Sequence, residues 1–592
     1  MSAGLRIEAM RVSRRVRGGR RVLNDISLTI EPGELVAIVG GSGTGKTTLL
    51  DILAGIRPAA EGTVGHDRPL GFGYVPQDDI IHLELPLART LRYAARLRLP
   101  RGTPTAALDA AVDDVLAALD LTDRRALRVG SLSGGQRKRA SIAVELLTRP
   151  GAFFLDEPTS GLDPARAAEL MRLLRRLADE GTTIVLATHN PPDVRHCDKV
   201  AFLAGDGHLV YFGPPAAAPA YFGTAAFDEI YEVLAGDGEP RRRSDRFAAS
   251  RAAGSAWAGS ARTGSARAGS APAAAAADPP PAAVAPPRRP GIGALGQWAL
   301  LTRRNLDILA RNRLTLALLA GSPVMVLLMF AVLFRPGAFD PAHPSPNATV
   351  MIAFWIAFGG FFFGLTYGLL QICTEFAVVR RERLAGLGAA PYVLAKATAL
   401  LPLLLAADVL MLAVLRALDR LPGADPAAYG RLFVTLALSS AAALALGLLV
   451  SAAVSDPAQA AVAMPMICFP QVLFVGAILP VPVMAAAGRV LSYPMSNRWA
   501  FEGLGHGLGL ARLWARGGSP LGPPLLASYG DTFSRPVAAD WAILGGFAVA
   551  LLAAACVVLA RRAPAPRPSS ARAAPDRYGR APGPGRSPRR SR

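Results

Sequence analysis

Apolar residues gather into two kinds of run along this chain, and the first kind is short. Three runs of six to eight mostly apolar residues cover Glu34–Val39, Ala152–Glu157 and Thr182–His189. A short run that is apolar on both faces predicts a buried strand, and helical patterns separate the three runs. Residues 1–238 are therefore predicted to form an α/β domain with a mostly parallel sheet covered by helices.

The second kind of run is long enough to cross a membrane. Six stretches of about 20 apolar residues cover Leu314–Phe334, Thr349–Ile372, Ala397–Leu418, Leu432–Val454, Pro457–Leu479 and Trp541–Ala560. We expect residues 314–562 to form an all-α transmembrane domain of six helices. Six spans put both ends on one side of the membrane. The start MSAGLRIEAM lacks the apolar segment of a signal peptide, so that side is expected to be the cytoplasm. The short loop after the second span agrees through its positive residues Arg380, Arg381, Arg383 and Lys396.

Two segments are poor in large apolar residues. Residues 239–292 and 563–592 are rich in Ala, Gly, Pro, Ser and Arg, which predicts a disordered linker and a disordered basic tail. Residues 293–313 predict an amphipathic connecting helix lying in the membrane interface. One side of that helix carries Leu295, Trp298, Leu301, Leu306, Ile308 and Leu309, and the other carries Arg303, Arg304, Asp307 and Arg311.

The net charge of +20 at first suggests a nucleic-acid partner. However, residues 239–291 hold nine arginines against three acidic residues, and residues 561–592 hold ten against one. Most of the excess therefore belongs to the predicted linker and tail rather than to a folded groove. We expect no nucleic-acid binding; that alternative would require the six long apolar stretches to form a soluble core.

A phosphate-binding motif stands directly after the first predicted strand. It reads GGSGTGKTT and comprises Gly40, Gly41, Ser42, Gly43, Thr44, Gly45, Lys46, Thr47 and Thr48. A helical pattern, LLDILAG, follows it, as the phosphate loop of a P-loop NTPase requires. Glycines let backbone N–H groups turn toward phosphates, Lys46 places a positive charge on the outer phosphates, and Thr47 offers a hydroxyl to Mg²⁺.

Two carboxylates follow at the end of the second strand, in FFLDEPTSGLD. Asp156 is predicted to hold Mg²⁺ through its water shell, and Glu157 to polarise the attacking water beside the γ-phosphate. A plain acidic loop is the alternative, and the nearby phosphate loop makes it the less favoured one.

A second anion-binding turn lies in SLSGGQRKR. Ser133 is a good helix N-cap, and Gly134, Gly135 and Gln136 open a basic helix that continues through SIAVELL. The positive end of that helix dipole is directed at an anion. The question is which phosphate this turn contacts, since the chain already has a phosphate loop about 90 residues upstream.

Essentially all of residues 1–235 resemble the nucleotide-binding domain of an ABC transporter. The resemblance rests on five motifs that occur in this order: the P-loop, YVPQ, LSGGQ, FLDEPTSGLD and LATH. The stretches LARTLRYAARLRLP, LVYFGPP and RRERLAGLGAAPYVLAK resemble the White, or G, subfamily of half-transporters with an ABC-2-type membrane domain. The resemblance implies that Gln77 senses Mg²⁺ and the membrane domain. It also implies that His189 contacts the γ-phosphate beside Glu157, and that Asp163 links two ATP sites.

The resemblance also answers the question raised by the second turn. In the family this turn closes on the phosphate loop of a second nucleotide domain, which implies a homodimer with two composite ATP sites. In the membrane half the resemblance implies a coupling helix containing Arg381 and Glu382, and a relay glutamate at Glu375. A carboxylate at the membrane surface is the alternative for Glu375.

Two further positions stand out. Asp408 falls near the centre of the third predicted span, where charge is costly and a functional role is therefore expected. A structural, hydrogen-bonded carboxylate is the alternative. In many ABC domains an aromatic residue stacks on adenine, but the corresponding position lies near Val16 or Arg17, and neither is aromatic.

Taken together, we expect an ATP-hydrolysing half-transporter of the bacterial inner membrane, with its nucleotide domain and both termini in the cytoplasm. Its expected partners are a second copy of the chain, the bilayer, and a hydrophobic small molecule or lipid that it exports. ATP and Mg²⁺ are its expected cofactors. The alternative is a membrane-anchored ABC ATPase with a regulatory or envelope-remodelling role and no cargo.

Overall fold

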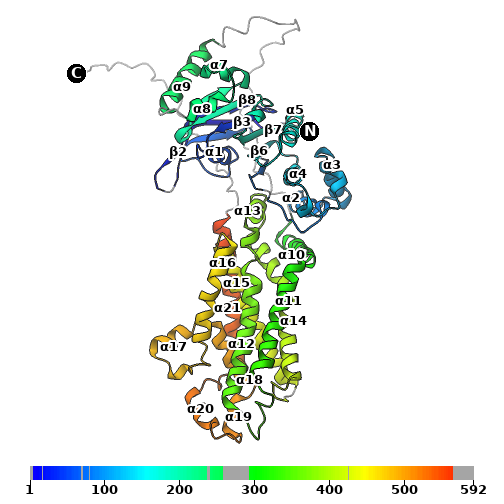
Figure 1. Ribbon diagram of the computed structural model, residues 1–592, viewed down its shortest axis with the longest axis vertical. Coiled ribbons are helices and arrows are strands. Elements are labelled where there is room, and N and C mark those ends of the chain that lie inside the picture. Colours follow the sequence, from blue (N-terminus) through cyan, green and yellow to red (C-terminus); the bar gives the residue numbers. More distant parts are fainter. Residues whose placement is uncertain are drawn as a thin grey trace, which may run out of the picture.

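The computed structural model has a sheet-containing domain at one end and a long bundle of helices at the other (Figure 1). It describes residues 4–16, 18–67, 71–78, 80–235, 240–257, 292–423 and 426–563. Two helices, α10 (Ala294–Arg311) and α13 (Phe376–Leu384), lie at the junction between the two parts. The site of any communication between sheet and bundle is therefore built around these helices.

The N-terminal domain contains one nine-stranded sheet with the order β4-β1-β2-β9-β8-β3-β7-β6-β5. The strands are β1 (Ile7–Arg15), β2 (Arg21–Ile30), β3 (Leu35–Gly40), β4 (Glu61–His66), β5 (Phe72–Val75), β6 (Ala152–Asp156), β7 (Thr183–Thr188), β8 (Lys199–Ala204) and β9 (His208–Gly213). Strands β5, β6, β7, β3 and β8 pair in parallel, whereas β1 pairs antiparallel with β2 and β4. Strands β3, β6 and β7 are buried along their whole length. The three predicted strands are confirmed, with ends that differ by at most one residue.

The helices of this domain are α1 (Lys46–Leu53), α2 (Leu87–Arg98), α3 (Thr105–Ala118), α4 (Gly134–Leu146), α5 (Pro164–Asp179), α6 (Pro191–Val194), α7 (Ala218–Phe222), α8 (Glu229–Ala235) and α9 (Pro240–Trp257). Helices such as α1, α5 and α9 pack on the sheet, whereas α2 and α3 pack on each other and on α4. Helix α9 corrects the prediction of a linker that is disordered from residue 239. Its Phe247 is buried and packs against the rings of Tyr211 and Tyr221, each with a centroid distance of 6.1 Å. The rest of the predicted linker, residues 258–291, and the predicted tail from residue 564 lie outside the described residues.

The C-terminal part is all helical. Its further helices are α11 (Arg313–Leu333), α12 (Pro346–Leu369), α14 (Ala389–Ala417), α15 (Pro426–Ala453), α16 (Pro457–Leu473), α17 (Ala486–Ser492), α18 (Ser496–Gly507), α19 (Leu510–Arg516), α20 (Gly522–Tyr529) and α21 (Val537–Arg562). Each of the six predicted spans corresponds to one helix: α11, α12, α14, α15, α16 or α21. Among the described residues, four segments are long and apolar enough to cross a membrane, and they contain α12, α14, α15 and α21. Helix α16 is shorter than predicted: it contains Pro465 and Pro470, and it ends at Leu473 rather than Leu479.

Helix α10 forms as predicted, but its faces are used differently. Leu295 and Leu306, from the predicted apolar side, are exposed, whereas Arg304, from the predicted polar side, is buried. The reason is a partner: Arg304 is paired with Glu382 of α13 through both of its terminal nitrogens, with an Nη2–Oε2 distance of 3.0 Å. The helix therefore packs into the junction on a partly charged face.

Candidate functional site: a nucleotide site and its link to the membrane helices

The phosphate loop connects β3 to α1 and curls around the ammonium group of Lys46. Gly43 and Gly45 have φ angles of 81° and 95°, and a Cβ on Gly45 would lie 2.7 Å from the carbonyl oxygen of Val22. Glycine is therefore required at this turn. Lys46 Nζ donates to the carbonyls of Gly40 and Gly41 at 2.9 and 3.0 Å. The loop thus forms a preorganised cradle, with Ser42, Thr44 and Thr48 along its rim.

The predicted metal ligands Thr47 and Asp156 lie side by side. The hydroxyl of Thr47 donates to Asp156 Oδ1 at 3.2 Å, from the start of α1 to the end of β6. Burial raises the pKa of Asp156, so a cation beside it would stabilise the charged carboxylate. Two oxygen ligands next to a phosphate cradle suit Mg²⁺, which keeps several waters and takes its other ligands from phosphates. These residues therefore fit the predicted metal.

Two of the three predicted catalytic side chains, Gln77 and His189, converge on the third, Glu157, which follows β6. Gln77 Nε2 donates to Glu157 Oε2 at 3.1 Å, and His189 Nδ1 lies 3.2 Å from Glu157 Oε1. The backbone of Glu157 is left-handed, with a φ of 46°, and its N–H donates to Ala187 on β7 at 2.9 Å. Such a conformation is costly for a residue other than glycine and clusters at functional sites. A pocket of about 280 Å³ beside it is lined by Glu157, Ser160, Gly161 and His189 among others.

The signature turn Ser133–Gln136 is built as predicted but belongs to a different part of the domain. Ser133 caps α4: its hydroxyl accepts from Gln136 N at 3.4 Å, and Gln136 Oε1 accepts from Ser133 N at 3.1 Å. Helix α4 packs on β5, α2, α3 and α5, whereas α1 packs on β2, β3, β6 and β7. Gly134 and Gly135 lie at the start of α4, and a Cβ on Gly134 would meet open space. The exposed helix start is thus available to a phosphate that the chain's own loop does not hold.

Asp163 connects the catalytic segment to α4. It caps α5, and its side chain accepts from the backbone and side chain of Arg166 at 3.1 and 3.2 Å. A Cβ on Gly135 would lie 3.2 Å from Arg166 Cδ, so α5 packs closely against the start of α4.

The predicted coupling residues occupy a buried charged layer between sheet and bundle. Glu375 is bound within the bundle by Lys396 at 2.9 Å and Tyr392 at 3.2 Å. Glu382 is bound by Arg304, as described above. Arg381 forms an ion pair with the nucleotide domain: its Nε lies 3.7 Å from Glu145 Oε1 on α4.

Other members of this layer were not predicted. Arg98 on α2 pairs with Glu145 through both oxygens at 2.7 Å, and the two side chains are almost fully buried. Asp307 on α10 accepts from the hydroxyl of Tyr93, and from Arg89 at 3.1 Å. Burial and this hydrogen bond raise the pKa of Tyr93 to about 12. The one local signal was Glu145 itself, a single carboxylate within the apolar stretch SIAVELL.

Asp408 is fully buried on α14, and its Oδ1 accepts from the hydroxyl of Ser440 on α15 at 3.1 Å. Its Oδ2 has no hydrogen-bond partner within the described part of the chain. We expect Asp408→Asn to change both the rate of ATP-driven transport and its pH profile, because a half-satisfied buried carboxylate is poised to exchange a proton.

The matched control for Asp408 is Asp419→Asn, the same substitution at an exposed residue just after α14. ATPase activity and cargo movement are measured in liposomes between pH 6 and pH 8. Unchanged activity, pH profile and expression of Asp408→Asn would assign this carboxylate a structural role only.

The predicted adenine-stacking position is partly described. Val16 is exposed and offers no aromatic surface, while Arg17 lies outside the described residues. Base stacking on an aromatic side chain is worth about 1–3 kcal/mol. We therefore expect GTP to compete with ATP within about tenfold, since 1.4 kcal/mol corresponds to a factor of ten. Competition of GTP with a labelled ATP analogue measures this ratio. Val16→Tyr should raise the preference for ATP; strong adenine selectivity of the native protein would contradict this expectation.

Comparison with known proteins finds a match to one family in each half of the chain. Residues 23–160 match the model of the ABC transporter family, and residues 296–508 match that of the ABC-2 type transporter family. The ABC transporter ATP-binding/permease protein Rv1747 of Mycobacterium tuberculosis is 32% identical over 512 residues, which cover 82% of this chain and 55% of that protein.

Relatives from plants and animals match a smaller part. ABC transporter G family member 13 of Arabidopsis thaliana is 38% identical, covering 35% of this chain and 33% of its own length. The broad substrate specificity ATP-binding cassette transporter ABCG2 of Rattus norvegicus is 35% identical, covering 37% of each chain. Among solved structures, cbiO1 of Clostridium perfringens, part of the ABC transporter complex cbiONQ, is 29% identical with a TM-score of 0.34, covering 36% of this chain and 90% of that one. The chain thus spans about half the length of the mycobacterial relative and about a third of the two G family members.

Proposed function

We propose that the chain is an ATP-hydrolysing half-transporter that works as a homodimer. The premise is that residues 23–160 belong to the ABC transporter family and residues 296–508 to the ABC-2 type transporter family. The observation that carries the proposal is the convergence of Gln77 and His189 on Glu157, beside the phosphate loop. A carboxylate held by two polar side chains at the end of a buried strand is positioned to polarise a water next to a γ-phosphate.

Each residue of the site has a proposed task. The loop from Gly40 to Thr48 binds the phosphates of ATP, and Lys46 neutralises the outer two. Thr47 and Asp156 would hold Mg²⁺, assisted by Gln77, and the bound ion would supply positive charge beside the transferred phosphoryl group. Glu157 takes the proton of the attacking water. His189 orients Glu157 and contacts the γ-phosphate.

The second half of each ATP site is proposed to come from a partner copy. The start of α4 is exposed at Gly134, α4 and the helix α1 that follows the phosphate loop pack on different elements, and Ser133 is the N-cap of α4. A helix start with free N–H groups binds a phosphate favourably. Asp163, at the start of α5 beside α4, would then link the two sites of the dimer.

The membrane domain is proposed to export a hydrophobic or lipidic molecule from the inner membrane of a bacterium, with the nucleotide domain on the cytoplasmic side. Support comes from the apolar composition of the spans and from the positive loop between α12 and α14. Few charged groups lie in the spans, which favours an apolar cargo over a charged solute.

Purified protein in liposomes tests the proposal. We expect ATP hydrolysis that a cargo stimulates, together with accumulation of that cargo on one side of the bilayer. Lipids or small molecules that copurify with the protein are the first candidates. Hydrolysis without movement of any cargo would instead support the regulatory or envelope-remodelling alternative, and absence of Mg²⁺-dependent ATP hydrolysis would overturn both.

A further inference from the structure

Three positions along helix α4 matter for its connections: its N-cap, a residue in its first half and a residue near its end. Ser133 caps its start, Lys138 lies in its first half, and Glu145 lies near its end. A rise of 1.5 Å per residue places Ser133 and Glu145 about 18 Å apart. A single short helix therefore connects the signature turn to the junction with the membrane helices.

The middle contact reaches the chain's own catalytic site. Lys138 is buried, and its Nζ donates to the carbonyls of Pro76 and Gln77 at 3.2 and 2.7 Å. The side chain of Gln77 in turn donates to Glu157. Lys138 therefore ties α4 to the loop that carries Gln77.

The far contact is a carboxylate shared between two arginines. Both oxygens of Glu145 accept from Arg98 of α2 at 2.7 Å, and Arg381 of α13 approaches one of them at 3.7 Å. Burial on its own would raise the pKa of Glu145, but the neighbouring Arg98 and Arg381 outweigh it and hold this pKa below its ordinary value. Glu145 is therefore an anion with one cation in its own domain and another in the membrane domain.

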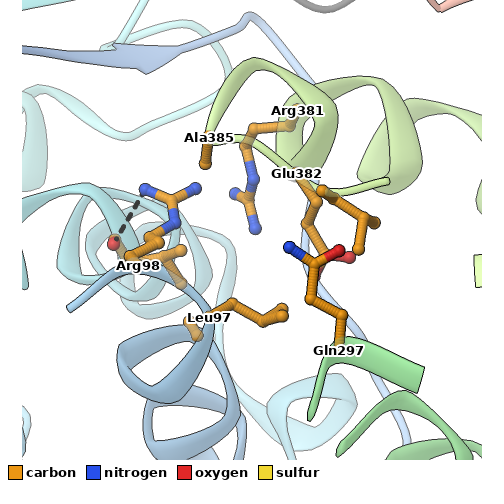
Figure 2. Close-up of a pocket in the computed structure, with 9 residues that line it drawn as sticks. Leu97, Arg98, Gln297, Arg381, Glu382 and Ala385 are labelled. Atoms are coloured by element: carbon orange, nitrogen blue, oxygen red, sulfur yellow. Dashed lines mark hydrogen bonds between the residues drawn. The ribbon is translucent and has the colours of Figure 1, made fainter. Parts of the chain in front are cut away.

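Arg381 is incompletely bonded in this arrangement. It is buried, and its Nε and Nη1 have no hydrogen-bond partner among the residues that the structure describes. The adjacent Glu382 is already occupied by Arg304. Figure 2 shows the guanidinium of Arg381 pointing into a small cavity of about 10 Å³, between Arg98 and the amide of Gln297. A charge-assisted hydrogen bond is about 2.7–2.9 Å long, so a shift of about 1 Å would bring Arg381 onto Glu145.

We propose that Glu145 is a positioning residue through which α4 transmits nucleotide binding to α13, and that it gains Arg381 as a hydrogen-bond partner when α4 moves. The inference rests on the proposed function, because it needs ATP to be bound at the signature turn. Under this proposal α4 links the signature turn directly to the membrane domain, in addition to the link through Gln77. The route is made of the Ser133 cap, the rigid helix and the Glu145–Arg381 pair.

Hydrogen–deuterium exchange of the full-length protein tests the route. The Glu157→Gln protein is the reference, with and without ATP and Mg²⁺, and peptides from the phosphate loop and from α13 are followed in the same sample. In the reference we expect ATP to slow exchange in the phosphate loop because the loop binds its phosphates, and in α13 because Arg381 gains bonds to Glu145. Glu145→Gln and Arg381→Gln, each added to the reference, should keep the slowing at the phosphate loop and lose it at α13.

Two features keep this test decisive. Glu145→Gln leaves Arg98 buried beside a neutral group and costs stability, whereas Arg381→Gln leaves the Arg98–Glu145 pair in place. Asp109→Asn, which removes the exposed ion pair of Asp109 with Arg92, is the matched control and should behave as the reference. Absence of slowing at the phosphate loop of the reference contradicts the proposed function. Two outcomes overturn the role of Glu145 when exchange at the phosphate loop does slow. In one, α13 still responds to ATP in Arg381→Gln; in the other, α13 does not respond to ATP in the reference.

Discussion

Glu157→Gln is expected to bind ATP normally and to hydrolyse it at least about a hundredfold more slowly, the lower end of what a general base contributes. Glutamine keeps the shape of glutamate but cannot accept the proton of the attacking water. Gln77 can still donate to the amide oxygen, and the amide NH2 can donate to His189 Nδ1 when that nitrogen carries no proton, so the site should keep its geometry. The variant should therefore accumulate with ATP trapped in a closed dimer.

Two measurements check this expectation: ATP turnover in liposomes and the amount of ATP that remains bound after rapid gel filtration. Glu180→Gln, the same change at an exposed residue at the end of α5, is the control and should leave both unchanged. Turnover near the native rate in Glu157→Gln would remove Glu157 from the role of base.

The centre of the nucleotide domain could be predicted because its signals are local. Buried parallel strands are apolar along their whole length, and this made β3, β6 and β7 visible in the sequence. The functional motifs stand directly at the ends of these strands, so parallel pairing alone brings Asp156 close to the phosphate loop. Strands β1, β2 and β4 pair antiparallel and mix exposed with buried positions, and no run of the first kind marks them.

The ends of the low-complexity linker and of the spans depended on features that composition and the apolar pattern do not show. Residues 240–257 look structureless by composition, yet one aromatic residue, Phe247, docks onto Tyr211 and Tyr221 and supports a helix there. In α16 the apolar pattern continues to Leu479, but the helix ends at Leu473, shortly before Gly476, whose left-handed φ of 97° does not continue an α-helix.

The junction was the least predictable part, because its pairs join residues that are remote in sequence. Arg98 and Glu145 are 47 residues apart, and Arg304 and Glu382 are 78 apart. Amphipathic patterning assumes that charged residues face water, so it placed Arg304 on the exposed side of α10. Arg304 is buried instead, because it pairs with the buried carboxylate of Glu382 on α13.

The second large effect concerns assembly: two inactive variants are expected to restore ATP occlusion when they are mixed. The chain has one phosphate loop and one signature turn, and α1 and α4 pack on different strands and helices. Lys46→Ala removes the cation that the loop surrounds. Ser133→Arg removes the cap of α4 and places a bulky side chain at the exposed helix start. Each variant alone should therefore disable both sites of a homodimer.

A mixed dimer of these variants contains one site with both defects and one site with neither. Random assembly makes about half of the dimers mixed, so about a quarter of all sites become intact. Because turnover can require both sites together, the assay is occlusion of ATP with Glu157→Gln present in every chain. Occlusion should be near zero for each variant alone and rise to about a quarter of the Glu157→Gln reference in the mixture. Differently tagged chains report whether subunits exchange. If mixed dimers form and occlusion stays at the level of the single variants, Ser133 and Lys46 do not act across a subunit boundary.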